Sequence, residues 1–294
     1  MQQTKGIILA GGYGSRLYPL TYGVSKQLIP VYDKPMIYYP LSILLMAGIK
    51  DILIITKIED KSSFRKLLGD GKKYGINIEY AVQEIPGGIA EALIIGANFI
   101  DKYNVCLILG DNIFHGNKMK LFLRDALNNL TDGLSTIFGI KVNNPSEFGV
   151  VGLNSDNEII SIIEKPINPK SEIIVSGLYF YPNSVLKILS DLKPSKRGEL
   201  EITDINSYYL NKKKLKMIDL TNDVTWVDTG TYKSLIDASN YFQKFEESSG
   251  SKVACIEELV YKMGYIKKEQ LIALADEMKS SEYGKYLLST LKND

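Results

Sequence analysis

Short apolar runs alternate with segments of helical periodicity through the first half of the chain. Continuous runs rich in Ile, Leu and Val, typical of strands buried on both faces, lie at residues 6–10, 51–56, 77–82 and 105–109. Apolar residues at helical spacing predict helices near residues 35–48, 60–68, 88–99 and 117–129. This alternation indicates an α/β fold with a Rossmann-like, mostly parallel central sheet flanked by helices. In such sheets ligands bind at the carboxyl ends of the strands.

The second half of the chain follows a different pattern. Successive strands are predicted at residues 134–142, 148–153, 158–164 and 174–181. A helical segment at 200–211 precedes two strands near 215–219 and 224–227. The chain is predicted to be helical from Thr231 onward. Several strands in succession are typical of an insertion that extends a sheet or covers a cleft.

These patterns divide the chain into two regions. We expect a domain over residues 1–240, of which 1–133 is the α/β part and 134–230 the strand-rich part. A helical C-terminal region over 241–294 is expected to pack on the core and to contribute to assembly. The segment Glu246–Ser251 is the one candidate linker.

Composition and charge exclude several classes of protein. The 294 residues are 45% hydrophobic and 23% charged, which is ordinary for a globular protein, and the formal charge of +1 argues against nucleic-acid binding. Cys106 and Cys255 are too isolated for a zinc site or a disulfide framework. No apolar stretch has the length of a membrane span, and a strand predicted close to the N-terminus leaves no room for a signal peptide. A cytoplasmic location is therefore expected.

The first predicted strand runs into a glycine-rich loop. Gly11, Gly12 and Gly14 follow the strand, and the cations Arg16 and Lys26 come next. Glycines at a strand's carboxyl end let backbone N–H groups approach a phosphate chain, and cations add complementary charge. Leu17 breaks a dinucleotide-binding fingerprint, and Arg16 stands where a P-loop needs lysine. A tight turn is the alternative, but the two cations favour a polyphosphate ligand.

Three polar residues elsewhere are candidates for chemistry. Asp111 follows a buried strand and is placed to hold Mg²⁺, although an Asx turn or helix cap would also account for it. Asp228 is a second candidate whose alternative role is an N-cap. Gln83 carries an amide that suits the imide edge of thymine or uracil, unless it is a surface glutamine in a turn. His115 is the only histidine, which disfavours Ser-His or Cys-His chemistry.

Motifs along nearly the whole chain resemble the sugar-nucleotide pyrophosphorylases (nucleotidylyltransferases), in particular those that transfer a thymidylyl group. The resemblance rests on Gly-Gly-Tyr-Gly-Ser-Arg-Leu at 11–17, Ser-Lys-Gln-Leu-Ile-Pro at 25–30 and Lys-Pro-Met-Ile at 34–37. It continues through Gln83–Gly88, Glu-Phe-Gly-Val-Val at 147–151, Glu-Lys-Pro at 164–166 and Trp-Val-Asp-Thr-Gly-Thr at 226–231. Ser15 replaces the family's usual threonine and keeps its hydroxyl.

The resemblance implies an activity. The expected reaction converts dTTP and α-D-glucose 1-phosphate to dTDP-glucose and pyrophosphate by Mg²⁺-dependent direct in-line displacement, a first step toward dTDP-deoxysugars such as dTDP-rhamnose. Residues 1–133 would bind the nucleotide and 134–230 the sugar phosphate. Two alternatives stay open: uridylyl transfer to give UDP-glucose, and a non-catalytic relative that senses nucleotide sugars. An NAD-dependent oxidoreductase is weakened by Leu17.

Matching the family's motifs residue by residue gives the expected site. Catalytic roles are implied for Arg16, Lys26 and Lys165. Nucleotide binding is implied for Leu9, Gly11, Gly12, Gly14, Ser15, Arg16, Gln83, Pro86, Gly88 and Asp111. Sugar-phosphate binding is implied for Asn112, Gly149, Glu164, Lys165 and Val175. The magnesium ligands would be Asp111 and Asp228.

The resemblance also implies partners. Related thymidylyltransferases are commonly tetramers, so we expect a homotetramer in which residues 254–292 help to form contacts. A second, regulatory dTDP-sugar site at a subunit interface is expected on the same ground. No nucleic-acid or membrane partner is expected.

Overall fold

The computed structural model describes residues 3–291. Its strands are β1 (Thr4–Ala10), β2 (Pro30–Val31), β3 (Lys34–Pro35), β4 (Asp51–Thr56), β5 (Asn77–Val82), β6 (Asn104–Leu109), β7 (Asn112–His115), β8 (Ser135–Lys141), β9 (Gly149–Leu153), β10 (Ile159–Glu164), β11 (Ile173–Tyr181), β12 (Leu215–Asp219) and β13 (Thr225–Asp228). Its α-helices are α1 (Tyr38–Met46), α2 (Lys61–Leu68), α3 (Glu91–Ile95), α4 (Ala97–Ile100), α5 (Met119–Thr131), α6 (Ile202–Asn211), α7 (Tyr232–Ser249), α8 (Ile256–Lys262), α9 (Lys268–Glu277) and α10 (Glu282–Thr290).

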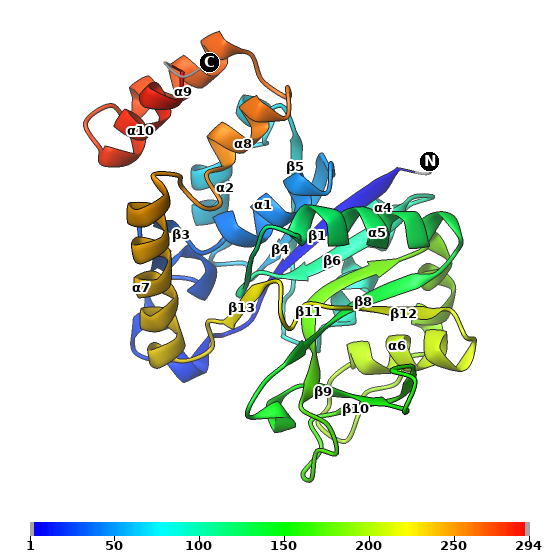
Figure 1. The fold of residues 1–294 in the computed structure, drawn as a ribbon. Coiled ribbons are helices and arrows are strands. Elements are labelled where there is room, and N and C mark those ends of the chain that lie inside the picture. The colour runs from blue at the N-terminus through cyan, green and yellow to red at the C-terminus, as the bar shows by residue number, and fades with distance from the viewer. Residues whose placement is uncertain (1–2, 292–294) are drawn as a thin grey trace.

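Nine of the strands in residues 3–291 form one mixed sheet (Figure 1). Its main path runs β10-β9-β11-β6-β1-β4-β5, and β8 and β12 extend it from β11. The strands β6, β1, β4 and β5 are parallel neighbours, whereas β11 runs antiparallel to β6. The expected mostly parallel α/β sheet is therefore confirmed for the first half of the chain, and the strand-rich second half adds the antiparallel strands.

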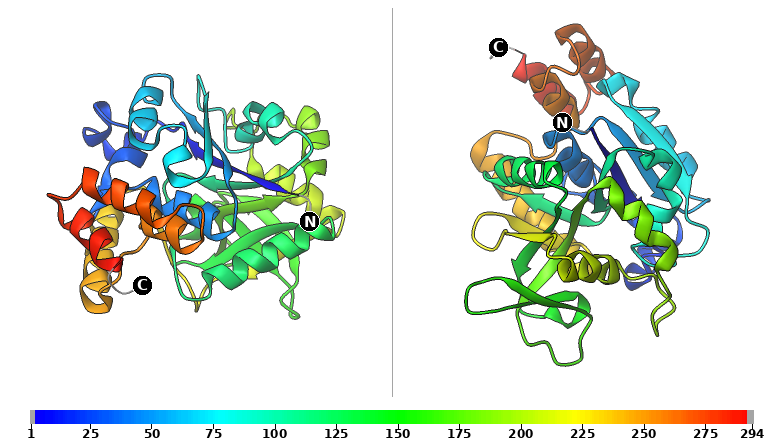
Figure 2. Two further views of the ribbon diagram at one scale, coloured as in Figure 1. Left: turned by 90° about the horizontal axis from the view of Figure 1, so that it is seen from above. Right: turned by 90° about the vertical axis from the view of Figure 1, so that its right-hand side faces the viewer.

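The sheet is the middle of three layers, because the side chains of its strands alternate between two faces and both faces are covered. Ile8, Ile54 and Ile108 share a buried cluster with apolar residues of α1, α2 and α5. Their neighbours Ile7 and Leu107 instead join a cluster with α3, α6 and the loops of the other face. Because successive side chains of a strand point to opposite faces, a continuous apolar strand needs cover on both. Figures 1 and 2 show helices on either side of the sheet.

Strand register brings the functional loops together. Leu9 of β1 is paired with Ile55 of β4 and Leu109 of β6, so these strands end at one edge. The Gly110 N–H donates to the Leu9 carbonyl over 2.9 Å, which fixes the loop after β6 beside the loop after β1. The glycine-rich loop and Asp111 are therefore neighbours in space although about a hundred residues separate them in sequence.

A second, two-stranded sheet crosses this edge. Strand β7 pairs antiparallel with β13, so that Asp228 lies opposite Asn112 and Thr225 opposite His115. The sequence pattern did not predict β7, because its four residues directly follow a strand and its partner lies far along the chain. This ladder brings Asp228 to Asp111, since Asp111 immediately precedes β7.

Several boundaries differ from the expectation. The predicted helix at 88–99 is divided into α3 and α4, and Gly88 does not open it but lies in the preceding loop with φ of +107°. A Cβ there would come within 2.3 Å of the Leu200 carbonyl oxygen, so this close approach requires glycine. The segment Glu246–Ser251 is also not a free linker, because α7 continues to Ser249 and Glu246 is buried among ion-pair partners.

The C-terminal helices form their own group at one end of the molecule, away from β9 and β10 (Figures 1 and 2). Helix α8 contacts α1, and α9 and α10 contact α8. Ile256 and Val260 of α8 share the buried cluster that contains Leu41 and Leu45 of α1. Within residues 3–291, no helix combines the length and apolar character needed to cross a bilayer.

Candidate active site

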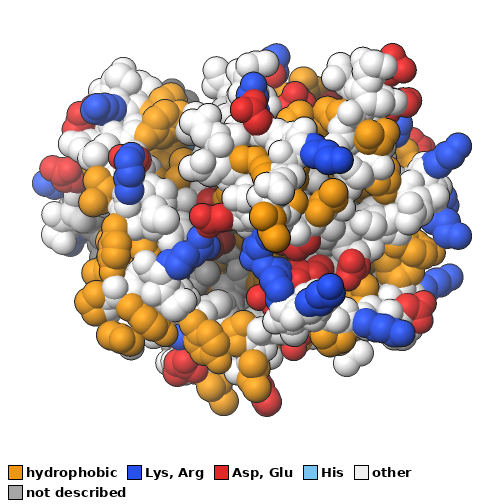
Figure 3. All heavy atoms as spheres, turned by 90° about the horizontal axis from the view of Figure 1, so that it is seen from below, with side chains coloured by type: hydrophobic (Ala, Val, Ile, Leu, Met, Phe, Trp, Pro, Cys, Tyr) orange, Lys and Arg blue, Asp and Glu red, His pale blue; other side chains and the backbone are white. Residues whose placement is uncertain are grey.

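A charged cleft opens where the parallel strands end. It consists of two connected hollows of about 250 and 170 Å³ that share Arg16 and Asp111. The larger hollow is lined by the glycine-rich loop, Lys26 and Gly230. The other is lined by residues from both parts of the chain, including Asn112, Gly149, Glu164, Lys165, Val175, Trp226 and Asp228. Figure 3 shows, from the side on which β9 and β10 project, acidic and basic side chains around a hollow.

The loop after β1 depends on two of its glycines. Gly14 has φ of +63°, and a Cβ on it would lie 3.0 Å from Thr21 Cγ2 and 3.3 Å from Lys26 Cβ. A Cβ on Gly11 would lie 2.3 Å from Gln83 Oε1. A side chain at either position would displace a polar residue of the site. The loop therefore brings its backbone close to Gln83 and Lys26.

Arg16 reaches across the cleft. Its Nη1 donates to Glu147 Oε2 over 2.8 Å, and both side chains are more than half exposed. Leu17 is buried beside it and anchors the loop. Because an exposed ion pair contributes little stability, Arg16 is able to exchange Glu147 for another anion.

Lys26 and Asp111 form the central ion pair of the cleft. Lys26 Nζ donates to Asp111 Oδ2 over 2.5 Å, and only 6% of the lysine side chain is exposed. Asn112 Nδ2 donates to Asp111 Oδ1 over 3.1 Å and thereby orients the carboxylate. Burial opposes ionisation of Asp111, but the Lys26 ammonium and these hydrogen bonds hold its pKa below the ordinary value.

Asp228 is the second carboxylate. Burial and the nearby negative charge of Asp111 raise the pKa of Asp228 from an ordinary value of 3.8 to about 6, against the opposing effect of Lys26 and Arg16. The alternative role for Asp228 as an N-cap is wrong, because Thr231 caps α7 and accepts from the Ser234 N–H. Asp111 likewise does not cap α5, whose N-cap is Lys118.

The donor set suits magnesium. Two carboxylates meet here, and burial, followed by the negative charge of Asp111, raises the pKa of Asp228. Among residues 3–291, no group of three or more His, Cys, Asp and Glu side chains is arranged to hold a metal ion. Mg²⁺ is commonly bound through one or two carboxylates, with substrate phosphates and water completing its six ligands. Asp111 and Asp228 fit that pattern.

Gln83 is a buried residue rather than a surface glutamine. Its side chain lies at the end of β5, where Nε2 donates to Glu91 Oε2 over 2.5 Å. The same oxygen accepts from the Gly87 N–H over 2.9 Å, so Glu91 fixes both the amide and the loop that carries Pro86 and Gly88. One amide hydrogen and the carbonyl oxygen beside Gly11 remain for a ligand.

The residues expected to bind sugar phosphate line the other hollow. Thr203 Oγ1 donates to Glu164 Oε2 over 2.5 Å, and a Cβ on Gly149 would contact both of these oxygens. Burial raises the pKa of Glu164 above its ordinary value, although the Thr203 hydrogen bond acts in the opposite direction. Lys165 is exposed with φ of +41°, a conformation that costs an L-residue energy and is frequent at functional sites.

Comparison with known proteins identifies the family. A model described as nucleotidyl transferase matches residues 5–244. The chain belongs to the nucleotidyl transferase family. A glucose-1-phosphate thymidylyltransferase from Neisseria meningitidis serogroup A is 52% identical over 288 residues, 98% of this chain and 99% of the relative. The enzyme of that name from Mycobacterium tuberculosis is 49% identical over 290 residues, 99% of this chain and 100% of the relative.

Solved structures of nucleotidyl transferases share the fold. A Bacillus anthracis protein assigned as a glucose-1-phosphate thymidylyltransferase and crystallised with sucrose has a TM-score of 0.75 and 40% identity, covering 81% of this chain and 94% of that one. A UDP-glucose pyrophosphorylase complexed with UDP-glucose has a TM-score of 0.70 at 24% identity, covering 83% and 100%. The second likeness concerns the fold alone.

Sequence reasoning missed residues of this nucleotidyl transferase site that act through others. Glu91 orients Gln83, and Trp226 Nε1 donates to Asn112 Oδ1 over 2.8 Å. Thr203 was not among the expected site residues, yet it holds Glu164. The one sequence feature that could have revealed such a residue is the single tryptophan, Trp226, two residues before Asp228. Glu91 and Thr203 have no such feature, because their partners Gln83 and Glu164 come from other elements.

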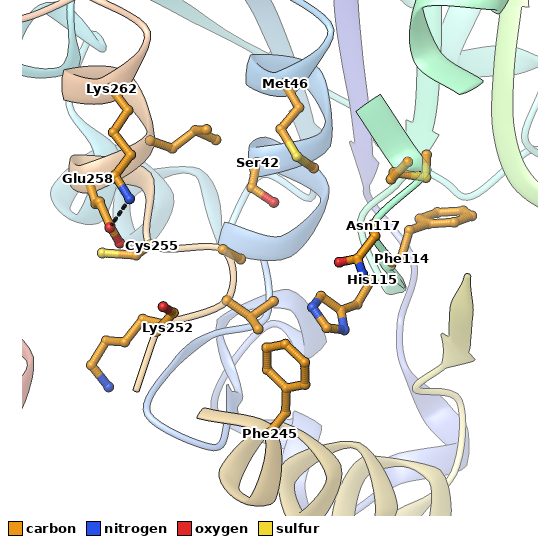
Figure 4. A pocket seen from close by; sticks show the side chains of 16 residues that line it. Ser42, Met46, Phe114, His115, Asn117, Phe245, Lys252, Cys255, Glu258 and Lys262 are labelled. Carbon is orange, nitrogen blue, oxygen red and sulfur yellow. Dashed lines mark ion pairs between the residues drawn. The ribbon is translucent and has the colours of Figure 1, made fainter. Parts of the chain in front are cut away.

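A second cavity of about 310 Å³ shares no lining residue with the cleft, and Figure 4 shows the side chains around it. Its walls come from α1, β7, the end of α7 and the segment that leads into α8. His115 projects toward Phe245, whose ring centroid is 4.3 Å away, and burial lowers the pKa of His115. Glu258 and Lys262 form an ion pair of 2.6 Å at the opposite wall. We call this cavity the second pocket.

Proposed function

We propose that this nucleotidyl transferase converts dTTP and α-D-glucose 1-phosphate to dTDP-glucose and pyrophosphate. The observation that carries the proposal is about 50% identity, over nearly the full length of both chains, to enzymes named glucose-1-phosphate thymidylyltransferase. The cleft adds the chemistry, since its two hollows are lined by Asp111, Asp228, Arg16, Lys26 and Lys165 among other charged residues. Purified protein should form dTDP-glucose from these substrates, and failure to do so would contradict the proposal.

The cations have separate roles in this proposal. Arg16 binds the triphosphate and the leaving pyrophosphate after it gives up Glu147. Lys26 stabilises charge that develops around the α-phosphate, because its ammonium is buried at the end of the phosphate loop. Lys165 anchors the sugar phosphate, whose oxygen attacks. A phosphate monoester is already anionic near neutral pH, so positioning and electrostatics suffice without a strong general base.

The remaining residues bind the two substrates. Leu9, Gly11, Gly12, Gly14 and Ser15 surround the nucleotide, and Gln83, with Pro86 and Gly88, contacts its base. Asn112, Gly149, Glu164 and Val175 surround the sugar phosphate. Residues 1–133 and 134–230 are thereby the two halves of one catalytic domain.

Mg²⁺ would be held by Asp111 and Asp228. When bound there, it supplies charge neutralisation for the triphosphate. The protein's own contribution is to keep both carboxylates oriented. Asn112 does this for Asp111 by a hydrogen bond, and the β7–β13 register does it for Asp228.

We further propose direct displacement without a covalent nucleotidyl-enzyme. His115 lines the second pocket rather than the cleft, and the two cysteines are buried in the core. The test is exchange of labelled pyrophosphate into dTTP with sugar phosphate rigorously absent. A covalent intermediate supports that exchange, whereas direct displacement does not. Metal-dependent exchange under those conditions would overturn the mechanism while leaving the overall reaction intact.

Nucleotide choice is the finer part of the proposal. Gln83 can hydrogen-bond the imide edge of thymine or uracil equally well. We therefore compare initial rates with dTTP, UTP, CTP and ATP at fixed glucose 1-phosphate. The thymidylyl proposal requires the highest kcat/KM with dTTP, and a preference for UTP would instead favour UDP-glucose formation.

Assembly and regulation complete the proposal. We propose a homotetramer to which α8–α10 contribute contacts, and a regulatory dTDP-sugar bound in the second pocket. The apolar walls of that pocket, with Lys252 and Lys262 at its edge, suit an anionic ligand with an apolar face. Light scattering that shows a monomer at every protein concentration would contradict the tetramer. The cytoplasmic location remains a prediction of the sequence.

A further inference from the structure

Four charged side chains meet outside the cleft, two of them buried and two partly exposed. Lys34 Nζ donates to Glu246 Oε1 over 2.9 Å, and Lys252 Nζ donates to Glu246 Oε2 over 3.1 Å. Asp33 forms ion pairs with both lysines. The exposed fractions of the Lys34 and Glu246 side chains are 1% and 5%. We call Asp33, Lys34, Glu246 and Lys252 the four-charge cluster.

The four-charge cluster fixes the tip of a hairpin. Strands β2 and β3 are joined by Tyr32 and Asp33, and Tyr32 has φ of +60°, which is unfavourable for an aromatic residue. A residue keeps such an unfavourable backbone conformation only where contacts with the surrounding structure enforce it. Here the Tyr32 N–H donates to Ser239 Oγ of α7 over 3.1 Å, while Lys34 and Asp33 are held by the cluster.

The base of the same hairpin carries the catalytic lysine of the proposed mechanism. The Ile37 N–H donates to the Gln27 carbonyl over 2.9 Å, and the Met36 N–H donates to the Ile29 carbonyl over 3.0 Å. These bonds hold the single 3₁₀ turn Lys26–Leu28, from which Lys26 reaches Asp111. The segment from the cluster to Lys26 is therefore short and hydrogen-bonded at both ends.

Energetics favour a positioning role for these charges. Replacing a buried ion pair by apolar residues of similar volume is often neutral or stabilising, whereas removing one partner is strongly destabilising. Stability alone therefore gives no reason to bury Lys34 and Glu246 here. The directional hydrogen bonds that these charges form do give a reason, because they fix the position of the hairpin. Position matters for catalysis, since a displacement of about 1 Å at a reacting group can reduce the rate about 100-fold.

We propose that Lys34 and Glu246 are positioning residues for Lys26, acting through the β2–β3 hairpin. This inference rests on the catalytic role proposed above for Lys26. The α7 helix thereby acts on the reaction from outside the cleft, although neither Glu246 nor Lys34 lines it.

The main test is the double variant Lys34→Met/Glu246→Met in the full-length protein. It removes one cation and one anion together, preserves volume and leaves Asp33 paired with Lys252. We expect a folded protein whose kcat is reduced about 10- to 100-fold with an unchanged KM for glucose 1-phosphate. The control Lys233→Met/Asp237→Met removes an exposed ion pair from the same helix and should leave kcat unchanged. Wild-type kcat in the cluster variant would overturn the inference.

A double-mutant cycle with Lys26→Ala separates this inference from the proposed function. If the cluster acts through Lys26, its variant costs no further activity in the Lys26→Ala background. An equal loss in both backgrounds would contradict that route. High activity of Lys26→Ala alone would instead refute the role of Lys26. If the cluster variant does not fold, Ser239→Ala, which loosens the hairpin tip at Tyr32, should give a smaller fall in kcat, and wild-type kcat would count against the proposal.

Discussion

The cleft and the second pocket lie at opposite ends of the same short ladder. Strand β7 begins at Asn112 in the cleft and ends at His115 in the second pocket, and β13 accompanies it. The cleft contains ion pairs across its opening and carboxylates with perturbed pKa values. The second pocket has walls formed largely by apolar and aromatic side chains, among them Met46, Phe114 and Phe245.

This difference indicates that the cleft is suited to a reaction and the second pocket to ligand binding. Charges fixed in a partly buried site stabilise charge that develops in a transition state, because they need no reorganisation when it forms. An apolar cavity with a few polar groups binds a ligand by shape but offers little for phosphoryl transfer. We therefore expect substitutions in the cleft to change kcat and those in the second pocket to change the response to ligands.

The largest effect should come from the carboxylates. Asp111→Asn or Asp228→Asn keeps the shape of the side chain but removes a charge that would hold Mg²⁺. A bound metal ion contributes several kcal/mol of transition-state stabilisation, so we expect kcat to fall about 10³-fold. Excess EDTA should abolish the wild-type activity, and added Mg²⁺ should restore it. Full activity of either variant, measured as dTDP-glucose formed per second, would remove that aspartate from the site.

Lys26→Ala should have the next largest effect. Removal of one preorganised group at a developing charge typically costs about 10²- to 10³-fold in kcat. The KM for glucose 1-phosphate should change little, because the charge of Lys26 is needed most in the transition state. Steady-state kinetics with varied glucose 1-phosphate separate the two constants. A variant that keeps more than half of the wild-type kcat would exclude Lys26 from catalysis.

A smaller effect is expected at Glu91, which holds the Gln83 amide. Glu91→Gln keeps the size of a side chain that accepts from Gln83 and Gly87 but removes its charge. Hydrogen bonds to charged groups contribute about 1.5–3 kcal/mol, so we expect the KM for dTTP to rise about 10-fold. The kcat should be nearly unchanged. A lower kcat at constant KM would show that Glu91 has a different role.

The sequence predicted the strands of the parallel sheet well because each is a continuous apolar run with its own boundaries. Strands β4 and β5 begin and end at the predicted residues, and β12 does so in the second half. Strand β7 was not predicted, because it is short and forms by pairing with β13 rather than showing an alternating pattern of its own. The linker expected at Glu246–Ser251 was wrong because the polar composition of that segment conceals a buried ion pair between Glu246 and Lys34.

The candidate site shows the same limit. The glycine-rich loop and Asp111 could be placed from sequence, since both follow buried strands that end at one edge of the sheet. The structure also brings Asp228 beside Asp111, which matches the order of motifs but not any local pattern. Partners such as Glu91 for Gln83, or Thr203 for Glu164, depend on contacts between elements that no residue spacing encodes.

Filling the second pocket should leave catalysis almost unchanged. Met46 lies on α1 and projects into the cavity, so Met46→Trp reduces its volume (Figure 4). We expect inhibition by dTDP-rhamnose to weaken at least about 10-fold, as the loss of well-packed apolar contacts commonly costs over 1 kcal/mol. The kcat without inhibitor should stay within about 2-fold, since the pocket shares no lining residue with the cleft. Unaltered inhibition would place the regulatory site elsewhere.

The smallest effect concerns a buried carboxyl group of α8. Glu257 of α8 is buried, and its Oε2 accepts from the Tyr283 hydroxyl of α10 over 2.6 Å. Burial raises the pKa of Glu257 above its ordinary value, although the Tyr283 bond and the charges of Lys73 and Lys34 act against this. A carboxyl whose pKa is higher in the folded state binds its proton more tightly there, so folding is favoured at low pH and loses this contribution as pH rises through the folded pKa.

Glu257→Gln should therefore stabilise the protein at neutral pH. Gln keeps an acceptor for Tyr283 without a buried charge, so its Tm at pH 7 should exceed that of the wild type by a few degrees. The difference should shrink as pH falls through the raised pKa and vanish below the ordinary value of 4.5, where both side chains are neutral. Thermal unfolding from pH 4 to pH 8 measures this dependence, with kcat at pH 7 unaffected because Glu257 lines neither the cleft nor the second pocket. A variant less stable at pH 7 would mean that the ionised carboxylate, through its bond to Tyr283, holds α10 against α8.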